Sequence, residues 1–464
     1  MKILPNKLSI KEKLGYGLGD TASNIVFQMV ANFMLIFYTD VYGLSAAAAG
    51  TLLLAVRLFD GITDPIMGGI ADRTRSRWGS YRPYLLFLAV PYGAIAVLAF
   101  ITPDFDSTGK LIYAYVTYGL LMTCYTAINI PYGALGAVMA TEPKERTSLQ
   151  SYRFAMAMAA LVVIVWAIPK LVEFFGSGND QLGYPLAMVF MGTLAAICFL
   201  LCFKYTKEKS LPNVEECTDG SANKGKLGLA KGTFTDFLTL FKNDQWVIVA
   251  VISLFTLILI GIRAAVAPHY IKYYVGDESL LSSFLTLSAI GSVLGAISTN
   301  FLTRFFEKKT LFKIALLVVV VTHSLFYFMA ADQIVAIFIV YFIANFAHMI
   351  ITPIMFSMVA DTVDYGTEKL GKTLTAIAFS GQLLAIKFGL AIGGAFAGWI
   401  LAFTSYEPNV TQSAESLSGI LLAFAGVPII CTLMCIVVIW KYKLTEPEVR
   451  KIQSSIAEKA SLTS

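Results

Sequence analysis

The chain has 464 residues, of which 57% are hydrophobic and 14% are charged, and its mean hydropathy is +0.71. Soluble globular domains are about half apolar and about a quarter charged, so the composition excludes that class and predicts a protein embedded in a lipid bilayer. The formal net charge of +5 comes from basic loops between apolar segments, and it gives no indication of a nucleic-acid partner.

Twelve apolar segments follow one another, each long enough to cross a hydrocarbon core of ~30 Å as a helix. They begin near Gly15, Ala46, Pro83, Leu111, Leu149, Tyr184, Trp246, Leu280, Thr310, Gln333, Leu374 and Leu417. One long hydrophilic stretch divides them six and six. We therefore expect an all-α polytopic membrane protein with an N-terminal six-helix bundle in 1–205, a central cytoplasmic loop in 206–245, a second six-helix bundle in 246–442 and a cytoplasmic tail in 443–464.

The positions of Lys and Arg predict the orientation, because cytoplasmic loops are enriched in these residues. If both ends of the chain are cytoplasmic, 28 of the 35 Lys and Arg residues fall in cytoplasmic segments. Only Lys110, Lys170 and Lys272 fall in outside loops. The N-terminal residues do not resemble a cleaved signal peptide, so the first apolar segment is expected to be a retained span of a bacterial inner membrane.

A polar stripe runs along the first predicted span. Its members are spaced by four residues, which places them on one helical face: Asp20, Asn24, Gln28 and Asn32. In the fourth span, Thr126 and Asn129 share a face beside Tyr132. Amides, hydroxyls and aromatic rings around a cavity suit a sugar, which needs hydrogen bonds and ring stacking. Hydrogen bonds between helices are the alternative interpretation.

The second predicted span holds Arg57, Asp60 and Asp64 in an apolar setting. An ionisable side chain at the bilayer centre costs at least ~2.5–3.5 kcal/mol, and two carboxylates one turn apart also repel each other. Their oxygens, with the Thr63 hydroxyl nearby, suit a hard cation or a shared proton. The alternative is that Arg57 pairs with Asp60 while Asp64 caps the end of the helix.

Lys387 is the one basic residue in the middle of the eleventh predicted span. A lone ammonium group in lipid needs a partner, and the candidates are Asp60 and Asp64 in the other half of the molecule. Such a pair would link the two bundles. The alternative is a lysine that reaches the membrane surface along its alkyl chain.

Basic hairpins follow the second and eighth predicted spans, at 68–84 and 299–312. This weak internal repeat is consistent with two related bundles around a substrate site at the midplane. We predict charge pairs that close an inner gate and break when it opens. The predicted gating residues are Arg57, Asp72, Arg73, Arg75, Asp361 and Asp364. Each residue of the hairpins is equally consistent with a topogenic or capping role.

The His and Cys residues are scattered and show no metal-ligand spacing. No nucleophile–base set or phosphate-binding loop is recognisable either. The sequence therefore predicts no enzyme activity, no cofactor and no metal other than Na⁺ as a coupling ion.

Several segments resemble the glycoside–pentoside–hexuronide:cation symporter family of the major facilitator superfamily. They are YGLGD with FYTDVYGLS, RLFDGITDPIMGGIADRTRSRWGSYRP, YTAINIPYG, SMVADTVDYGTEKLGKTLTA and the segment around Lys387. The similarity runs from about Lys11 to Tyr442, and the segments occur in the family's order. The resemblance implies the major facilitator fold and cation-coupled transport by alternating access.

The resemblance also implies roles for individual residues. Asp60 and Asp64 match the family's cation ligands, and Thr126 matches the hydroxyl that completes the site. Thr63 stands where melibiose permease, a member of the family, has an asparagine that favours sodium. H⁺ is therefore at least as well supported as Na⁺. Lys387 matches a lysine close to the cation carboxylates.

The sugar positions differ more from that relative. Arg153 matches an arginine of the sugar site, whereas Asn24 and Asn129 replace two aspartates and Gly133 replaces a stacking tryptophan. An α-galactoside is therefore disfavoured. With two carboxylates fewer, Arg153 and Lys387 are expected to be less fully neutralised, which would admit an anionic sugar. The sequence is most similar to the xyloside and glucuronide branches, which implies a β-xyloside or related pentoside, or a hexuronide.

The predicted function is thus symport of a small glycoside with a coupling cation, H⁺ or Na⁺, across the bilayer. A lysolipid carrier is one alternative, which the polar stripe of the first span disfavours. A membrane sensor without transport activity is another, but the short tail after Tyr442 leaves no room for a signalling domain.

Overall fold

The computed structural model describes residues 8–140, 143–208, 238–372 and 374–463, which are organised as helices. The first bundle contains α1 (Ile10–Ile36) with the π-helical turn η1 (Phe37–Val41), α2 (Ala46–Arg73), α3 (Arg82–Leu98), α4 (Ser107–Met139), α5 (Pro143–Gly176) and α6 (Asp180–Tyr205). The second contains α8 (Asp244–His269) with η3 (Tyr270–Val275), η4 (Glu278–Leu280), α9 (Leu281–Leu302), α10 (Lys308–Leu325), α11 (Ile334–Leu370), α12 (Thr375–Phe403), and a last helix formed by α13 (Ala414–Leu421), η5 (Leu422–Gly426) and α14 (Val427–Ile439). Helix α15 (Glu446–Thr463) follows.

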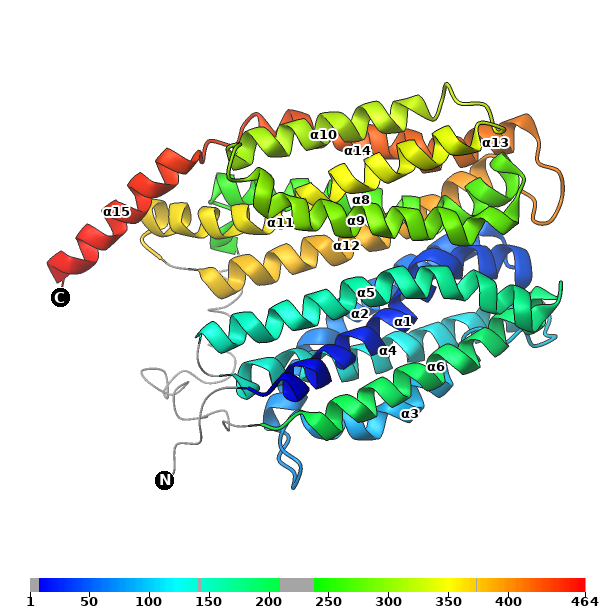
Figure 1. The fold of residues 1–464 in the computed structure, drawn as a ribbon, viewed down its shortest axis with the longest axis horizontal. Helices are drawn as coiled ribbons and strands as arrows, with labels where there is room; N and C mark the ends of the chain where they lie inside the picture. Colours follow the sequence, from blue (N-terminus) through cyan, green and yellow to red (C-terminus); the bar gives the residue numbers. More distant parts are fainter. Residues whose placement is uncertain (1–7, 141–142, 209–237, 373, 464) are drawn as a thin grey trace.

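The two bundles form two layers, and the start of α1 and the helix α15 lie at the same end of the molecule (Figure 1). We call this end the terminal end and the opposite one the distal end. Among the described residues, ten helices are long and apolar enough to cross a membrane. Helices α3 and α10, with 17 and 18 residues, lie alongside them and complete the predicted twelve. The fold class predicted from the sequence is therefore confirmed, whereas most of the predicted central loop lies outside the described residues.

Local sequence explains where several helices begin and end. Ser9 and Glu12 form a capping box at the start of α1, and the side chains of Ser45 and Asp106 accept backbone N–H groups at the starts of α2 and α4. Helix α11 ends at Gly371, whose φ of +67° is left-handed. Glycine adopts that conformation without a side-chain clash.

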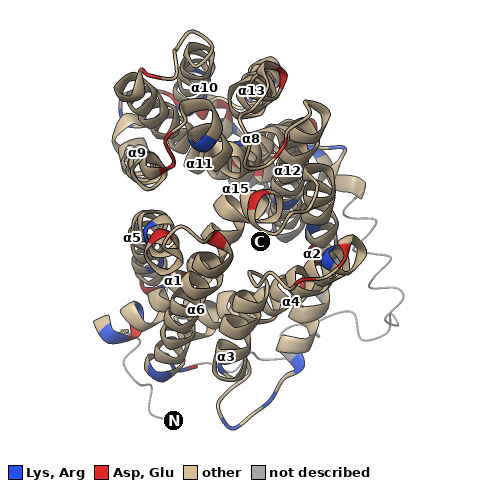
Figure 2. Ribbon diagram, turned by 90° about the vertical axis from the view of Figure 1, so that its right-hand side faces the viewer, with Lys and Arg blue, Asp and Glu red and all other residues tan. Residues whose placement is uncertain are grey.

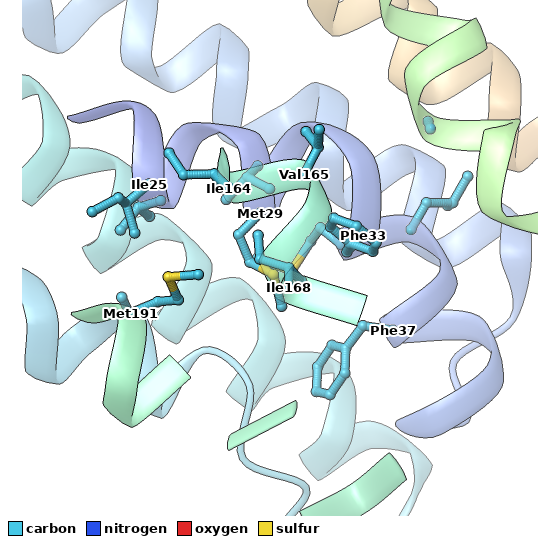
Figure 3. Packing of buried hydrophobic residues seen from close by; sticks show 14 of the residues in the cluster. Ile25, Met29, Phe33, Phe37, Ile164, Val165, Ile168 and Met191 are labelled. Atoms are coloured by element: carbon cyan, nitrogen blue, oxygen red, sulfur yellow. The ribbon is translucent and has the colours of Figure 1, made fainter. Parts of the chain in front are cut away.

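The core of the first bundle belongs to a continuous apolar cluster that surrounds α1 and extends into the second bundle. Ile25, Met29 and Phe33 project from one side of α1 toward α5 and α6, as Figure 3 shows. They meet Ile168 of α5 and Met191 of α6, and all five side chains are buried. The apolar spacing of three to four residues on α1 thus serves packing. Its polar stripe lies on another face of the same helix.

The bundles meet along α1 with α8, α2 with α12 and α5 with α9, an arrangement visible in the end-on view of Figure 2. A Cβ atom built on Gly398 of α12 would lie 2.7 Å from the Cα atom of Gly50 of α2, so the two backbones touch. On the other side of the interface, the Ser282 hydroxyl of α9 donates to the carbonyl of Trp166 of α5 at 2.8 Å. These contacts all lie in the distal half of the molecule.

The predicted tail contains a helix that the sequence interpretation did not include. Val449 and Ile452 of α15 are buried, and the Gln453 amide donates to Asp364 of α11 at 2.8 Å. The tail therefore packs on the terminal end of the second bundle.

Candidate functional site

The carboxylates of Asp60 and Asp64 lie together on α2 and meet a hydroxyl from α4. Thr126 Oγ1 is 2.6 Å from Asp60 Oδ1 and 3.0 Å from Asp64 Oδ1. A threonine hydroxyl has one hydrogen to donate, so it satisfies one of these two oxygens at a time. The second contact becomes favourable when the other carboxyl is protonated or when a cation lies between the oxygens. Asp60 and Thr126 are both almost fully buried.

Lys387 of α12 approaches the same pair from the other bundle. Its Nζ forms an ion pair with Asp64 and lies 3.8 Å from Asp60 Oδ2. The juxtaposition expected from the sequence is therefore present, and it links α2 to α12. Two carboxylates face one ammonium group, so the cluster has room for one more positive charge.

Two other residues near the pair lie differently from expectation. The Thr63 hydroxyl donates to the backbone carbonyl of Asp60 at 3.1 Å, along its own helix, and not to a carboxylate. Within the described residues Arg57 forms no ion pair with Asp60, and its guanidinium lies 5.6 Å from the ring centroid of Phe27. Asp64 sits inside α2, which continues to Arg73. The alternative of an Arg57–Asp60 pair with a capping Asp64 is therefore wrong for this conformation.

Arg153 lies in the first bundle with Asp20 as its partner. Its Nε is 3.2 Å from Asp20 Oδ2, and its guanidinium lies over the ring of Tyr132. Tyr132 is buried, stacks on Tyr16 and donates its hydroxyl to the Tyr16 carbonyl at 2.7 Å. Arg153 pairs with Asp20 and Lys387 with Asp64, so each has a carboxylate partner in this conformation, which gives no support to the expectation that they are less fully neutralised.

The two asparagines predicted to bind sugar also have partners in their own bundle. Asn24 Nδ2 donates to the Asp20 carbonyl at 2.9 Å. Asn129 Nδ2 donates to the Tyr125 carbonyl at 3.1 Å, and its Oδ1 accepts from the Ser23 hydroxyl at 2.6 Å. The side-chain oxygen Oδ1 of Asn24 forms none of these bonds, so it remains available as a hydrogen-bond acceptor.

A cavity of about 310 Å³ lies between the bundles. Polar residues of its wall come from both bundles: Gln28, Asn32, Arg57, Tyr118, Arg263, Ser288, Ser292, Tyr341, Asn345 and His348. Of the predicted substrate residues, Gln28 lines this cavity. Asn24, Asn129, Tyr132, Arg153 and Lys387 are not part of its wall, so the structure does not bring the predicted sugar residues together around one space.

The polar residues of the second bundle were missed by the sequence interpretation. Arg263 of α8 donates to Asn345 Oδ1 at 2.6 Å, and its other terminal nitrogen lies 3.4 Å from His323 Nε2. The signal was present, since Arg263 stands alone in an apolar segment as Lys387 does.

A polar cluster closes the distal end, and we call it the distal latch: Asp40, Lys272, Tyr273, Tyr406 and Asn409. The Asp40 carboxylate of η1 is almost completely buried and is 3.0 Å from Lys272 Nζ of η3. The hydroxyls of Tyr406 and Tyr273 both donate to it, the first at 2.5 Å. Asn409 Nδ2 donates to the Asp40 carbonyl at 2.7 Å. One carboxylate of the first bundle thus holds several donors of the second.

The predicted gating residues at the terminal end have partners within their own bundles. Asp361 of α11 forms an ion pair with Lys308 of α10 at 3.4 Å, and Asp364 accepts from α15. Arg75 donates to the Ser80 hydroxyl at 3.1 Å. Arg73 is exposed, and the side chain of Asp72 lies outside the described part of the chain.

The sequence matches the model of the MFS/sugar transport protein family over residues 15–446. The chain belongs to this family. It is 37% identical over 453 residues to the inner membrane symporter YicJ of Escherichia coli (strain K12), a match that covers 97% of this chain and 95% of YicJ. The chain is therefore a membrane transporter and not an enzyme, as predicted.

Two further relatives in the family have names that refer to sugars. The glucuronide carrier protein homolog of Escherichia coli (strain K12) is 31% identical, over 96% of this chain and 95% of that protein. The isoprimeverose transporter of Lactiplantibacillus pentosus is 30% identical, over 96% of this chain and 90% of that protein. These matches confirm the resemblance to glycoside–pentoside–hexuronide:cation symporters.

Among solved structures, the crystal structure of nucleoside transporter NupG aligns with a TM-score of 0.63 at 14% identity. The alignment covers 93% of this chain and all of that one. At this identity the match supports the fold, two bundles of transporter helices, and nothing finer.

Proposed function

We propose that the chain is a symporter that couples the entry of a cation, H⁺ or Na⁺, to the uptake of a glycoside across a bacterial inner membrane. The observation that carries the proposal is the cluster of Asp60, Asp64, Thr126 and Lys387. In this cluster, a carboxylate pair with one uncompensated negative charge takes part in a contact between the bundles. Relatives that are named symporters support the coupling.

Charge balance gives the mechanism. Without the coupling cation, Lys387 is the counter-charge of the carboxylate pair and ties α12 to α2. A cation bound between Asp60 and Asp64 competes with Lys387 for the same oxygens and weakens that tie. Cation binding therefore changes the relative free energies of the conformations, which is what a ligand needs in order to shift an equilibrium between them.

The terminal end is proposed to face the cytoplasm, because 28 of the 35 Lys and Arg residues lie in segments assigned to that side. The distal latch would then hold the outer side closed in this conformation. Asp72, Arg73, Arg75, Asp361 and Asp364 keep their proposed role as inner-gate residues that pair between bundles when the terminal end closes.

The proposed substrate is a β-xyloside or related pentoside, or a hexuronide. The names of the isoprimeverose and glucuronide relatives support these two classes. Most of the cavity wall is apolar, but the polar residues within it, Gln28 and Asn32 of α1 among them, favour a glycoside over a lysolipid.

Uptake into proteoliposomes, driven by an imposed Na⁺ gradient or an imposed pH gradient, tests the proposal with a panel of xylosides and hexuronides. Asp64→Asn is expected to abolish concentrative uptake, since it removes a charge that the cation neutralises, while glycoside binding persists. Asp104→Asn, in an exposed loop at the distal end, is the matched control. Wild-type accumulation by Asp64→Asn, or accumulation that persists with every ion gradient collapsed, would contradict the proposal.

A further inference from the structure

Arg263 is a buried positive charge at the wall of the central cavity. It lies in the distal third of α8 (Asp244–His269), with 6% of its surface exposed. Within the described chain its hydrogen-bond contacts are with two neutral groups, Asn345 and His323, and its guanidinium lies 5.5 Å from the ring centroid of Tyr341. Throughout the described chain, no carboxylate forms an ion pair with it.

The two neutral partners are fixed by their own helices. His323 Nδ1 lies 2.8 Å from the Val319 carbonyl, so this nitrogen carries the hydrogen and Nε2 presents a lone pair to Arg263. Asn345 Nδ2 donates to the Tyr341 carbonyl at 2.8 Å, which turns Oδ1 toward the guanidinium. These bonds position Arg263, but they do not neutralise its charge.

The other basic groups between the helices have carboxylate partners. Arg153 pairs with Asp20, Lys272 with Asp40, and Lys387 with Asp64. Among the described residues Arg57 forms no ion pair, but it lies one turn before the Asp60 carboxylate on the same helix. Arg263 has no such compensation. An uncompensated charge in a low-dielectric interior is costly, so an anion from outside the chain would find a favourable place beside it.

The cavity wall supports this conclusion. Two arginines, Arg57 and Arg263, contribute to the wall, and no Asp or Glu does among the residues that the structure describes. His348, also on the wall, is 3% exposed, and neither of its ring nitrogens has a hydrogen-bond partner. Gln28 and Asn32 of α1 also line the cavity, and because Asn32 Nδ2 donates to Gln28 Oε1 at 3.0 Å, Gln28 Nε2 and Asn32 Oδ1 are the amide atoms left for sugar hydroxyls.

We propose that Arg263 binds a carboxylate carried by the transported glycoside, with His348 as a further polar group of this anion subsite. The proposal rests on the proposed transport function and narrows its substrate to a hexuronide. A planar guanidinium matches a carboxylate with two parallel hydrogen bonds. Gln28 and Asn32 remain for the neutral part of the sugar. Asn345 and His323 are positioning residues, because they act by holding Arg263.

Two ligands that differ at one carbon test the proposal. 4-Nitrophenyl β-D-glucuronide carries a carboxylate where 4-nitrophenyl β-D-glucoside carries a hydroxymethyl group. Isothermal titration calorimetry on the purified transporter is expected to show at least roughly tenfold tighter binding of the glucuronide, as is common for a hydrogen bond to a charged group. Arg263→Gln should remove that preference and change glucoside affinity little. Arg263→Lys should retain part of the preference.

Several results would overturn the anion subsite. The first is equal affinity of the wild type for both ligands, and the second is no binding of the glucuronide at millimolar concentration. The third is an equal loss of affinity for both ligands in Arg263→Gln, together with no preference for the glucuronide in Arg263→Lys. If Arg263→Gln does not fold, the test uses the preference of the wild type for the glucuronide and the part of that preference that Arg263→Lys retains. Gradient-driven uptake of the glucoside without glucuronide binding would refute the subsite alone. Glucuronide binding through Arg263 without gradient-driven uptake would refute symport alone.

Discussion

At the scale of single residues, the hydroxyl of Thr126 determines how the carboxylate pair of α2 behaves. It lies within hydrogen-bonding distance of both Asp60 and Asp64, although it has one hydrogen to give. The pair is therefore least favourable when both carboxyls are ionised and nothing else is bound. That imbalance provides the driving force for binding a proton or a metal cation.

Thr126→Val keeps the shape of the side chain and removes the hydroxyl. It leaves a buried carboxylate without its donor, a change that costs about 1–3 kcal/mol, so we expect gradient-driven uptake to fall roughly tenfold or more. Thr126→Ser, which keeps the hydroxyl, should retain most of it. The measurement is initial uptake rate against cation concentration in proteoliposomes. Equal rates for the two variants would show that the hydroxyl has no part in cation binding.

The residue scale also shows what a sequence reveals about a membrane site. The partner of Lys387 could be predicted, because a lone ammonium in an apolar helix needs a carboxylate and Asp60 and Asp64 were the candidates. The same reasoning would not have predicted the surroundings of Arg263, because no carboxylate lies beside it among the described residues. Its neighbours Asn345 and His323 are neutral residues of other helices, and no spacing in the sequence connects them. The partner of Arg153 was not predicted: Asp20 lies beside it, a pairing that depends on how α1 and α5 pack.

At the scale of elements, the π-helical turns η1 and η3 extend α1 and α8 and carry the distal latch. The sequence showed that FYTDVYGLS is a family segment without indicating what Asp40 contacts. Its partners lie more than 200 residues away, at Lys272, Tyr406 and Asn409. Such contacts arise only when the ends of two bundles meet, so they cannot be found from local periodicity. The helices themselves were predictable, because apolar length alone determines them.

Tyr406→Phe removes one donor to the Asp40 carboxylate and leaves the ring in place. A hydrogen bond to a charged group contributes about 1.5–3 kcal/mol, so the conformation with a closed distal end should lose roughly tenfold or more of its relative population. The reporter is Ser288→Cys in the cavity wall, labelled with a membrane-impermeant thiol reagent from the distal side. Labelling should be faster with Tyr406→Phe and unchanged with Tyr327→Phe, an exposed tyrosine outside the latch. The parent without this cysteine gives the background rate, and unaltered labelling would exclude a latching role.

At the scale of the whole molecule, two bundles must exchange one set of contacts for another. The contacts present here lie in the distal half, where Gly50 and Gly398 allow α2 and α12 to touch. The ion pair of Lys387 with Asp64 is the charged link between the same two helices. Cation binding and the packing of α2 on α12 therefore act on one interface. A change in the packing should alter cation affinity, and cation binding should alter the packing.

Gly398→Ala tests this connection through packing alone. The added methyl group would lie 2.7 Å from the Cα atom of Gly50, so the helices must separate at the distal end. Overpacking of this kind costs about 1–3 kcal/mol, and it should raise distal labelling of Ser288→Cys and lower the maximal uptake rate. Gly119→Ala on α4, where no atom lies within 4 Å of the new methyl group, is the matched control.

If the packing of α2 on α12 and the cation site are coupled, Gly398→Ala should also weaken the contact between Lys387 and Asp64 and thereby lower the cation concentration that gives half-maximal uptake. A changed uptake rate with an unchanged cation dependence would separate the two and contradict a shared interface.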